Sequence, residues 1–200
     1  MVAGDRDTPM PMTLYLLDTN VLSNLSRPRP SQAILDWCHR LQPRNWCIAQ
    51  CTVTEIKRGI KLLRLKDEKR ASALDKWFKN VLSMKPRIIP PDFDIIEIHT
   101  DLSVIADLQN LFAPHPGRFP ACVGRDLEIA ATAIAVNAAV VTLNVKDFMQ
   151  INAHLRLPGL FNPETGEWLV RPRRRRRAGP DTNHAHWDRH RKLGSKLLNV

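Results

Sequence analysis

Short apolar runs alternate with helical patterns along most of this 200-residue chain, and this alternation constrains the fold more than any other feature. The first run, at residues 14–17, is continuously apolar, as expected of a strand that is buried on both faces. Further strands are predicted at 46–53, 87–89 and 139–143, with helical patterns between them. This order favours right-handed crossovers and an α/β fold whose mainly parallel central sheet is covered on both faces.

Capping residues and prolines bound the predicted helices. Thr54 is the predicted N-cap of a helix whose apolar side takes Ile56 and Ile60. Asp92 opens a longer pattern that extends to Leu108, and an alanine-rich helix is predicted over 125–136. The segment 113–124 is rich in proline and glycine and is therefore predicted to be a loop.

Charge divides the chain into a body and a tail. The net charge is +10, but residues 171–200 hold ten Lys or Arg and two Asp, which leaves only +2 for the first 170 residues. Composition also changes there, with an unbroken arginine run at 173–177. We therefore expect a flexible segment at 1–12, one folded domain at 13–170, and a basic, disordered tail at 171–200.

Composition excludes several classes of protein. No apolar run is long enough to cross a bilayer, and the N-terminus lacks the apolar core of a signal peptide, so we expect a cytoplasmic protein. The four cysteines show neither a C-x-x-C pair nor the spacing of a zinc site, which favours reduced thiols. Nucleotide hydrolysis is disfavoured because no glycine-rich phosphate loop is present.

Acidic residues follow three of the predicted strands. Asp18 comes directly after the first run, and Glu55 follows the second strand in the first turn of its helix. Asp147 comes four residues after the strand at 139–143. Because ligands of open parallel sheets bind at the carboxyl ends of the strands, these three side chains are expected to emerge at one edge.

A fourth carboxylate, Asp126, is predicted to reach the same region from a helix. It aligns with Ile129, Ala130 and Ala133 on the buried stripe, whereas Glu128 is predicted to face outward. A carboxylate on such a stripe is costly unless it is paired or binds a metal ion.

Clustered carboxylates raise one another's pKa values, and a hard divalent cation such as Mg²⁺ or Mn²⁺ relieves that repulsion. A site of this kind can activate water against a phosphodiester and stabilise the departing oxygen. Structural alternatives stay open for each residue: Asp18 as a helix cap, Glu55 as a partner of the helix dipole, and Asp147 as a turn residue.

Four ordered motifs carry a family resemblance. They are Leu-Asp-Thr-Asn-Val-Leu at 17–22, Thr-Glu-Ile at 54–56 with Gly59, Asp-Leu-Glu-Ile-Ala-Ala-Thr-Ala at 126–133, and Thr-x-Asn-x-x-Asp-Phe at 142–148. Together they resemble the PIN-domain ribonucleases, particularly bacterial toxins of the VapC and FitB type, over about residues 13–170. The resemblance implies a PIN-like α/β/α sandwich around a mainly parallel sheet and an Mg²⁺- or Mn²⁺-dependent RNA endonuclease.

The resemblance also implies residue roles and partners. It assigns metal and water handling to Asp18, Glu55 and Asp126, with Asp147 preferred over its neighbour Asn144 as the fourth member. The hydroxyls expected to orient these carboxylates belong to Thr19 and Thr142. As partners it implies a homodimer and a small, cognate, DNA-binding antitoxin that blocks the acidic pocket in a hetero-oligomer, with no membrane involved.

Two rival functions belong to other classes. A receiver-like phosphoacceptor fits poorly, because it needs an acidic pair before the aspartate of the first strand and a late lysine. A noncatalytic nucleic-acid-binding protein would use the basic tail, and deletion of 171–200 should abolish its function while sparing a nuclease. Arg125 and Lys146 either meet RNA phosphates or belong to solvated faces.

Overall fold

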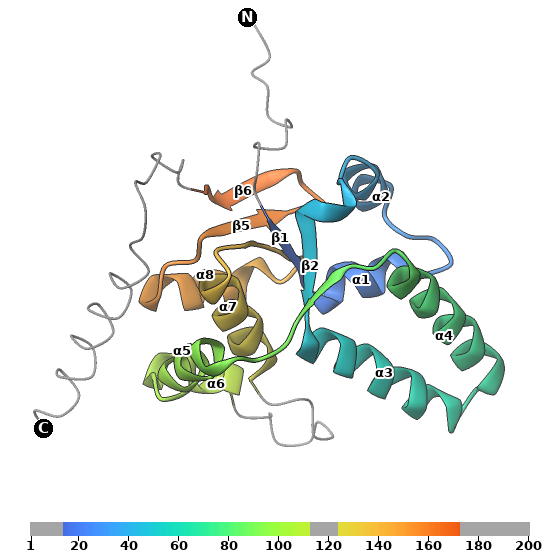
Figure 1. Cartoon of the computed structure of the whole chain (residues 1–200), viewed down its shortest axis with the longest axis horizontal. Helices are drawn as coiled ribbons and strands as arrows, with labels where there is room; N and C mark the ends of the chain where they lie inside the picture. Colours follow the sequence, from blue (N-terminus) through green and yellow to red (C-terminus); the bar gives the residue numbers. More distant parts are fainter. Residues whose placement is uncertain (1–13, 113–123, 173–200) are drawn as a thin grey trace, which may run out of the picture.

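A six-stranded sheet forms the centre of the molecule in this computed structural model, which describes residues 14–112 and 124–172 (Figure 1). Its strand order is β3-β2-β1-β4-β5-β6, with parallel pairing from β3 to β5 and antiparallel pairing between β5 and β6. The strands are β1 (Tyr15–Leu17), β2 (Trp46–Ala49), β3 (Arg87–Ile89), β4 (Ala139–Val141), β5 (Gly159–Asn162) and β6 (Glu167–Val170). The predicted α/β fold with a mainly parallel sheet is confirmed.

Helices cover both faces of the sheet (Figure 1). They are α1 (Thr19–Leu25), α2 (Gln32–His39), α3 (Gln50–Arg64), α4 (Glu68–Ser83), α5 (Phe93–Ser103), α6 (Gln109–Phe112), α7 (Arg125–Ala135) and α8 (Val145–His154), with short 3-10 turns η1 (Pro43–Asn45) and η2 (Ala106–Leu108). None of the helices in the described part of the chain is long and apolar enough to cross a membrane.

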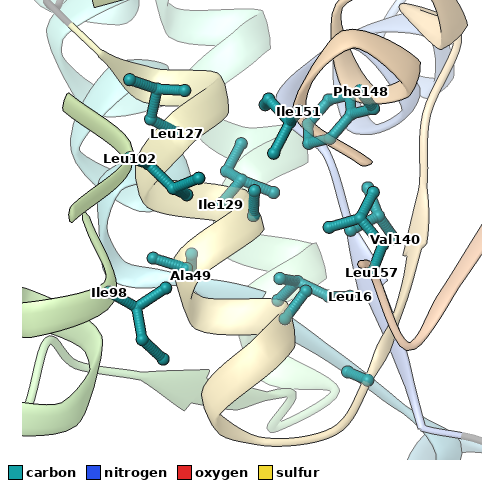
Figure 2. Close-up of a cluster of buried hydrophobic side chains, with 14 of the residues drawn as sticks. Leu16, Ala49, Ile98, Leu102, Leu127, Ile129, Val140, Phe148, Ile151 and Leu157 are labelled. Atoms are coloured by element: carbon teal, nitrogen blue, oxygen red, sulfur yellow. The ribbon is translucent and has the colours of Figure 1, made fainter. Parts of the chain in front are cut away.

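Two hydrophobic cores lie on opposite faces of the sheet, because successive strand side chains point to opposite sides. Leu16 belongs to the core under α5, α7 and α8, whereas Tyr15 and Leu17 belong to the core under α1 to α4. Figure 2 shows the first core, in which Ile98 of α5 and Leu127 of α7 belong to the same cluster as Leu16 of β1. A layer of helices on each side of the sheet is the α/β/α sandwich that the sequence predicts.

The border between β2 and α3 differs from the prediction. The strand ends at Ala49 and α3 begins at Gln50, so the expected strand at 46–53 is too long. Thr54 is therefore not an N-cap; its hydroxyl donates to the carbonyl of Gln50 inside the helix. Glu55 consequently lies in the second turn of α3 rather than the first.

Other boundaries are closer to the prediction. Asp92 caps α5 by accepting a hydrogen bond from the Ile95 N–H, but that helix ends at Ser103 and Leu108 lies in the separate turn η2. The strand predicted at 139–143 ends at Val141, which places Asp147 in the first turn of α8. The strands β5 and β6 were not predicted at all.

Several predictions fall wholly or mostly on residues outside the described ranges. These are the flexible segment at 1–12, the loop at 113–124 apart from Gly124, and the basic tail at 171–200 apart from its first two residues. Within the described ranges, Cys38, Cys47 and Cys51 are free thiols, as predicted.

Candidate active site

The carboxyl edge of the sheet gathers acidic side chains from four separate segments. Asp18 follows β1, Glu55 lies on α3, Asp126 is in the first turn of α7, and Asp147 is in the first turn of α8. Their charges act on one another: Glu55 raises the pKa of Asp18, and the other three carboxylates raise that of Asp126. The structure thus brings all four predicted acids into one electrostatically coupled group.

Asp18 is the most deeply placed member of the group, with 3% of its surface exposed. Its backbone N–H continues the sheet by donating to the Val141 carbonyl at 3.0 Å. Its Oδ2 accepts hydrogen bonds from the Thr142 hydroxyl and the Asn20 amide, both at 2.6 Å. Asp18 occupies the N-cap position of α1, yet its side chain makes no cap hydrogen bond. Burial raises its pKa to about 6, although the Thr142 hydrogen bond opposes that rise.

Thr142 joins the end of β4 to the segment that follows β1. Besides donating to Asp18, its Oγ1 accepts from the Asn20 amide at 3.1 Å and from the Asn144 N–H at 2.8 Å. Asn20 also accepts from the Leu143 N–H at 3.0 Å. These bonds join residues more than 120 positions apart in the sequence, so the two strand ends are fixed to each other.

Asn144 links the two acids that come from helices. Its Nδ2 donates to Asp126 Oδ2 at 2.9 Å and to Asp147 Oδ2 at 2.7 Å. Burial raises the pKa of Asp126 to about 7, and the charges of Asp18 and Asp147 add to that rise. Asp147 and Asn144, the two alternatives for the fourth position, therefore both lie at the site and contact each other.

Glu55 is held from two sides. The Thr19 hydroxyl donates to its Oε2 at 2.9 Å, and the same hydroxyl lies 3.3 Å from Thr52 Oγ1. On the other side, a guanidinium nitrogen of Arg125 lies 3.9 Å from Glu55 Oε2, and it also donates to the Cys51 carbonyl. The Arg125 side chain is only 15% exposed, so it does not belong to a solvated face.

Glu128 does not face fully outward as predicted. It is half-buried, and its charge adds to the effect of burial in raising the pKa of the Cys51 thiol. The physical reason is the position of α7, which packs against α3, α5 and α8 and so has little free surface. The prediction assumed a helix with one exposed side.

Two residues of the network, Asn20 and Thr52, were not predicted as site residues, and Arg125 was expected to meet RNA phosphates or to belong to a solvated face rather than to contact Glu55 and the Cys51 carbonyl. The position of Asn20, two residues after a strand-end aspartate, was a usable signal. Thr52 falls within the apolar stretch 46–53, which was predicted to be a strand, whereas the structure places it in α3. Arg125 gave no periodic signal, because its partners lie about 70 residues away.

The donor set suits a hard divalent cation, because carboxylate, amide and hydroxyl oxygens are the atoms that Mg²⁺ and Mn²⁺ prefer. The mutual repulsion that raises the pKa of Asp126 is the effect that such a cation would relieve. In the ranges that the structure describes, no three His, Cys, Asp or Glu side chains are already arranged to hold a metal ion. The carboxylates that would hold one are Asp18, Glu55, Asp126 and Asp147.

Comparison with known proteins gives a toxin and a ribonuclease that are similar to this chain, although no family model matches it. The chain is 27% identical over 151 residues to Toxin FitB of Neisseria gonorrhoeae, covering 75% of this chain and 98% of that protein. It is 33% identical over 64 residues to Ribonuclease VapC14 of Mycobacterium tuberculosis, covering 32% of this chain and 62% of that protein.

Solved structures agree with the sequence relatives. A FitAB complex bound to a DNA fragment has a TM-score of 0.58 at 27% identity, covering 76% of this chain and 96% of that one. VapBC2 of Rickettsia felis, bound to DNA from its promoter, has a TM-score of 0.55 at 25% identity, and the match covers 75% of this chain and 98% of that one. Order of motifs, sheet topology and these likenesses point in one direction: the chain is similar, in sequence and in fold, to proteins of the VapC and FitB type.

Proposed function

We propose that this chain is an endoribonuclease that hydrolyses RNA phosphodiester bonds with a bound Mg²⁺ or Mn²⁺ ion, and that it acts as the toxin of a toxin–antitoxin pair. The observation that carries the proposal is the convergence of four acids at the carboxyl edge of the sheet: hydrogen bonds through Thr142 and Asn144 join Asp18, Asp126 and Asp147. Glu55, held by Thr19, acts on the charges of Asp18 and Asp126. The name of the relative Ribonuclease VapC14 supports RNA as the substrate, and the name of the relative Toxin FitB supports the toxin role.

In such a reaction, hydroxyl and amide side chains of this protein orient the carboxylates that would bind the cation. Thr142 and Asn20 hold the Asp18 carboxylate in one orientation, and Thr19 does the same for Glu55. Asn144 keeps Asp126 and Asp147 together despite their repulsion. A divalent cation bound by these oxygens would supply the Lewis acid that activates water and stabilises the departing oxygen. No side chain has to become a covalent nucleophile.

Cleavage of a labelled single-stranded RNA tests the activity. The wild-type chain should cleave it with Mg²⁺ and lose that activity in excess chelator. Asp18→Asn should abolish cleavage while keeping the fold, because an amide oxygen can still accept from Thr142. The matched control is Asp94→Asn, which changes an exposed carboxylate on α5 and should cleave normally. Cleavage by purified Asp18→Asn at the wild-type rate would refute the proposal.

The partners belong to the same proposal. FitAB and VapBC2 are complexes solved on DNA, and we propose by analogy that a small DNA-binding antitoxin covers the acidic edge of this chain and that the chain forms a homodimer. Expression of the wild-type chain alone should arrest bacterial growth, and Asp18→Asn should not. Light scattering on the purified chain should give twice the mass of one chain.

A further inference from the structure

A cleft of about 470 Å³ opens beside the acidic edge of the sheet. Its wall includes Asn24 at the end of α1, Arg27 and Arg29 in the segment between α1 and α2, and Leu143, Asn162 and Glu164 on the opposite side. None of these residues belongs to the group of carboxylates described above.

The cleft adjoins the carboxylates through the strand order. Asn162 ends β5 and Leu143 follows β4, so the cleft lies at the same edge as Asp18 and within two strands of it. Neighbouring strands are about 4.8 Å apart, which separates the two places by roughly 10 Å. The Leu143 N–H donates to Asn20, whose amide donates to Asp18, so one chain of bonds runs from the cleft wall to the acidic site.

Hydrogen-bond donors without partners line this cleft. Arg27 and Arg29 are exposed, and neither forms an ion pair with any residue of the described ranges. Asn24 is only 7% exposed; its Oδ1 accepts from the Ser31 N–H at 2.9 Å, but its Nδ2 donates to no acceptor among the described residues. In the described residues, the Asn24 Nδ2 is not among the fully enclosed polar atoms that lack a partner, so this donor is open to the cleft, where a ligand can accept from it.

Phosphate is the group that best matches two unpaired guanidinium groups, since each can donate two parallel hydrogen bonds to its oxygens. Glu164 is the one carboxylate in the wall, and it leaves the arginines in excess. We infer that this cleft binds a neighbouring nucleotide of the RNA substrate, with its phosphate on Arg27 and Arg29 and an acceptor atom on the Asn24 amide. This inference rests on the proposed RNA cleavage, because that reaction places the strand at the adjoining carboxylates.

The test measures binding of a fluorescent single-stranded RNA to the full chain carrying Asp18→Asn, with Mg²⁺ present, by anisotropy at several salt concentrations. In that background, Arg27→Gln with Arg29→Gln should weaken binding about tenfold. It should also reduce the salt slope by about 1.4, because each lost phosphate contact contributes about 0.7 for single strands. The charge-matched control is Arg87→Gln with Arg156→Gln; both arginines are exposed, and they lie at the opposite edge of the sheet, where Arg87 begins β3 and Arg156 precedes β5.

Asn24→Asp is a second, nearly isosteric variant. It keeps an acceptor for the Ser31 N–H but replaces the free donor by a charged oxygen, so RNA binding should weaken while the melting temperature stays near that of the parent. Equal losses in the cleft and control double variants would overturn the inference, since any two positive charges would then serve. If the wild-type chain fails to cleave RNA, the proposed function falls even where the cleft variants alone weaken binding, so the two failures are distinguishable.

Discussion

At the scale of single residues, the site depends on buried polar side chains whose donors and acceptors have hydrogen-bond partners. Thr142 is completely buried, and its one hydroxyl serves Asp18, Asn20 and Asn144 at the same time. Buried polar groups of this kind contribute little while they are paired and cost much when a partner is removed. Two predictions follow from that asymmetry.

Thr142→Val should lower both stability and activity. The valine keeps the shape of the side chain but leaves Asp18 without one donor and the Asn144 N–H without its acceptor. We expect the free energy of unfolding to fall by about 1–3 kcal/mol and cleavage to fall roughly tenfold to a hundredfold. Thr142→Ser, which retains the hydroxyl, should recover most of the activity. Denaturant unfolding and the RNA cleavage rate measure the two effects, and a valine variant with wild-type cleavage would contradict the assigned role.

Asp126 should make the metal-free protein less stable as the pH rises. Its pKa of about 7 in the folded chain lies above the ordinary 3.8, so its contribution to stability is complete below pH 4 and is lost as the pH rises through 7. In chelator, the free energy of unfolding should fall by roughly 1–2 kcal/mol between pH 5 and 8, after allowance for solvent screening.

Asp126→Asn should reduce this dependence, because the amide carries no proton to lose, and the remaining slope should come from Asp18, whose pKa is also raised. Asp94→Asn is the control and should keep the wild-type slope. Mg²⁺ should restore stability at pH 8 in the wild-type chain more than in Asp126→Asn. An unchanged slope in Asp126→Asn would show that other groups cause the pH dependence.

At the scale of elements, two glycines face opposite surroundings. A Cβ on Gly159, at the start of β5, would lie 2.8 Å from the Ala139 Cβ on the neighbouring strand β4. A Cβ on Gly59, within α3, would meet nothing within 4 Å. The same substitution should therefore have opposite effects at the two positions.

Gly159→Ala should destabilise the chain by about 1–3 kcal/mol, because β4 and β5 would have to separate to admit the methyl group. Gly59→Ala should stabilise it by about 0.5–1 kcal/mol, because alanine loses less backbone freedom in a helix. Thermal or denaturant unfolding of both variants gives the comparison. A stable Gly159→Ala variant would show that the contact between β4 and β5 is loose.

The elements also show how far the sequence could be used for prediction. Continuous apolar runs predicted β1, β2 and β4, since each is buried between two helical layers, and the short run at 87–89 predicted the largely exposed edge strand β3. They did not predict where β2 ends, because Cys51 and Thr52 are buried on α3 just as they would be in a strand. The acids were found because strand ends can be identified, whereas the roles of Asn20 and Arg125 depend on partners brought near only by folding.

At the scale of the whole molecule, most of the excess positive charge lies C-terminal to the last strand of the sheet. The body carries nearly balanced charge, and the excess lies in the last thirty residues. A chain ending at residue 172 keeps every strand and helix described above. It should therefore cleave RNA with at least a tenth of the wild-type kcat, and its binding should depend less steeply on salt. Loss of all activity on truncation would instead favour the rival function, a nucleic-acid binder that acts through its basic tail.

The two edges of the sheet bear on how other chains can approach this one. At one edge, β3 is only three residues long, begins with Arg87 and is followed by Pro90 and Pro91. At the other, the pairing of β6 with β5 is interrupted by a register shift at Leu160 and Phe161. Short strands, charge, proline and irregular pairing all oppose the addition of a further strand. These features disfavour edge-to-edge pairing of two such sheets, so we expect a protein partner to bind through helices and loops.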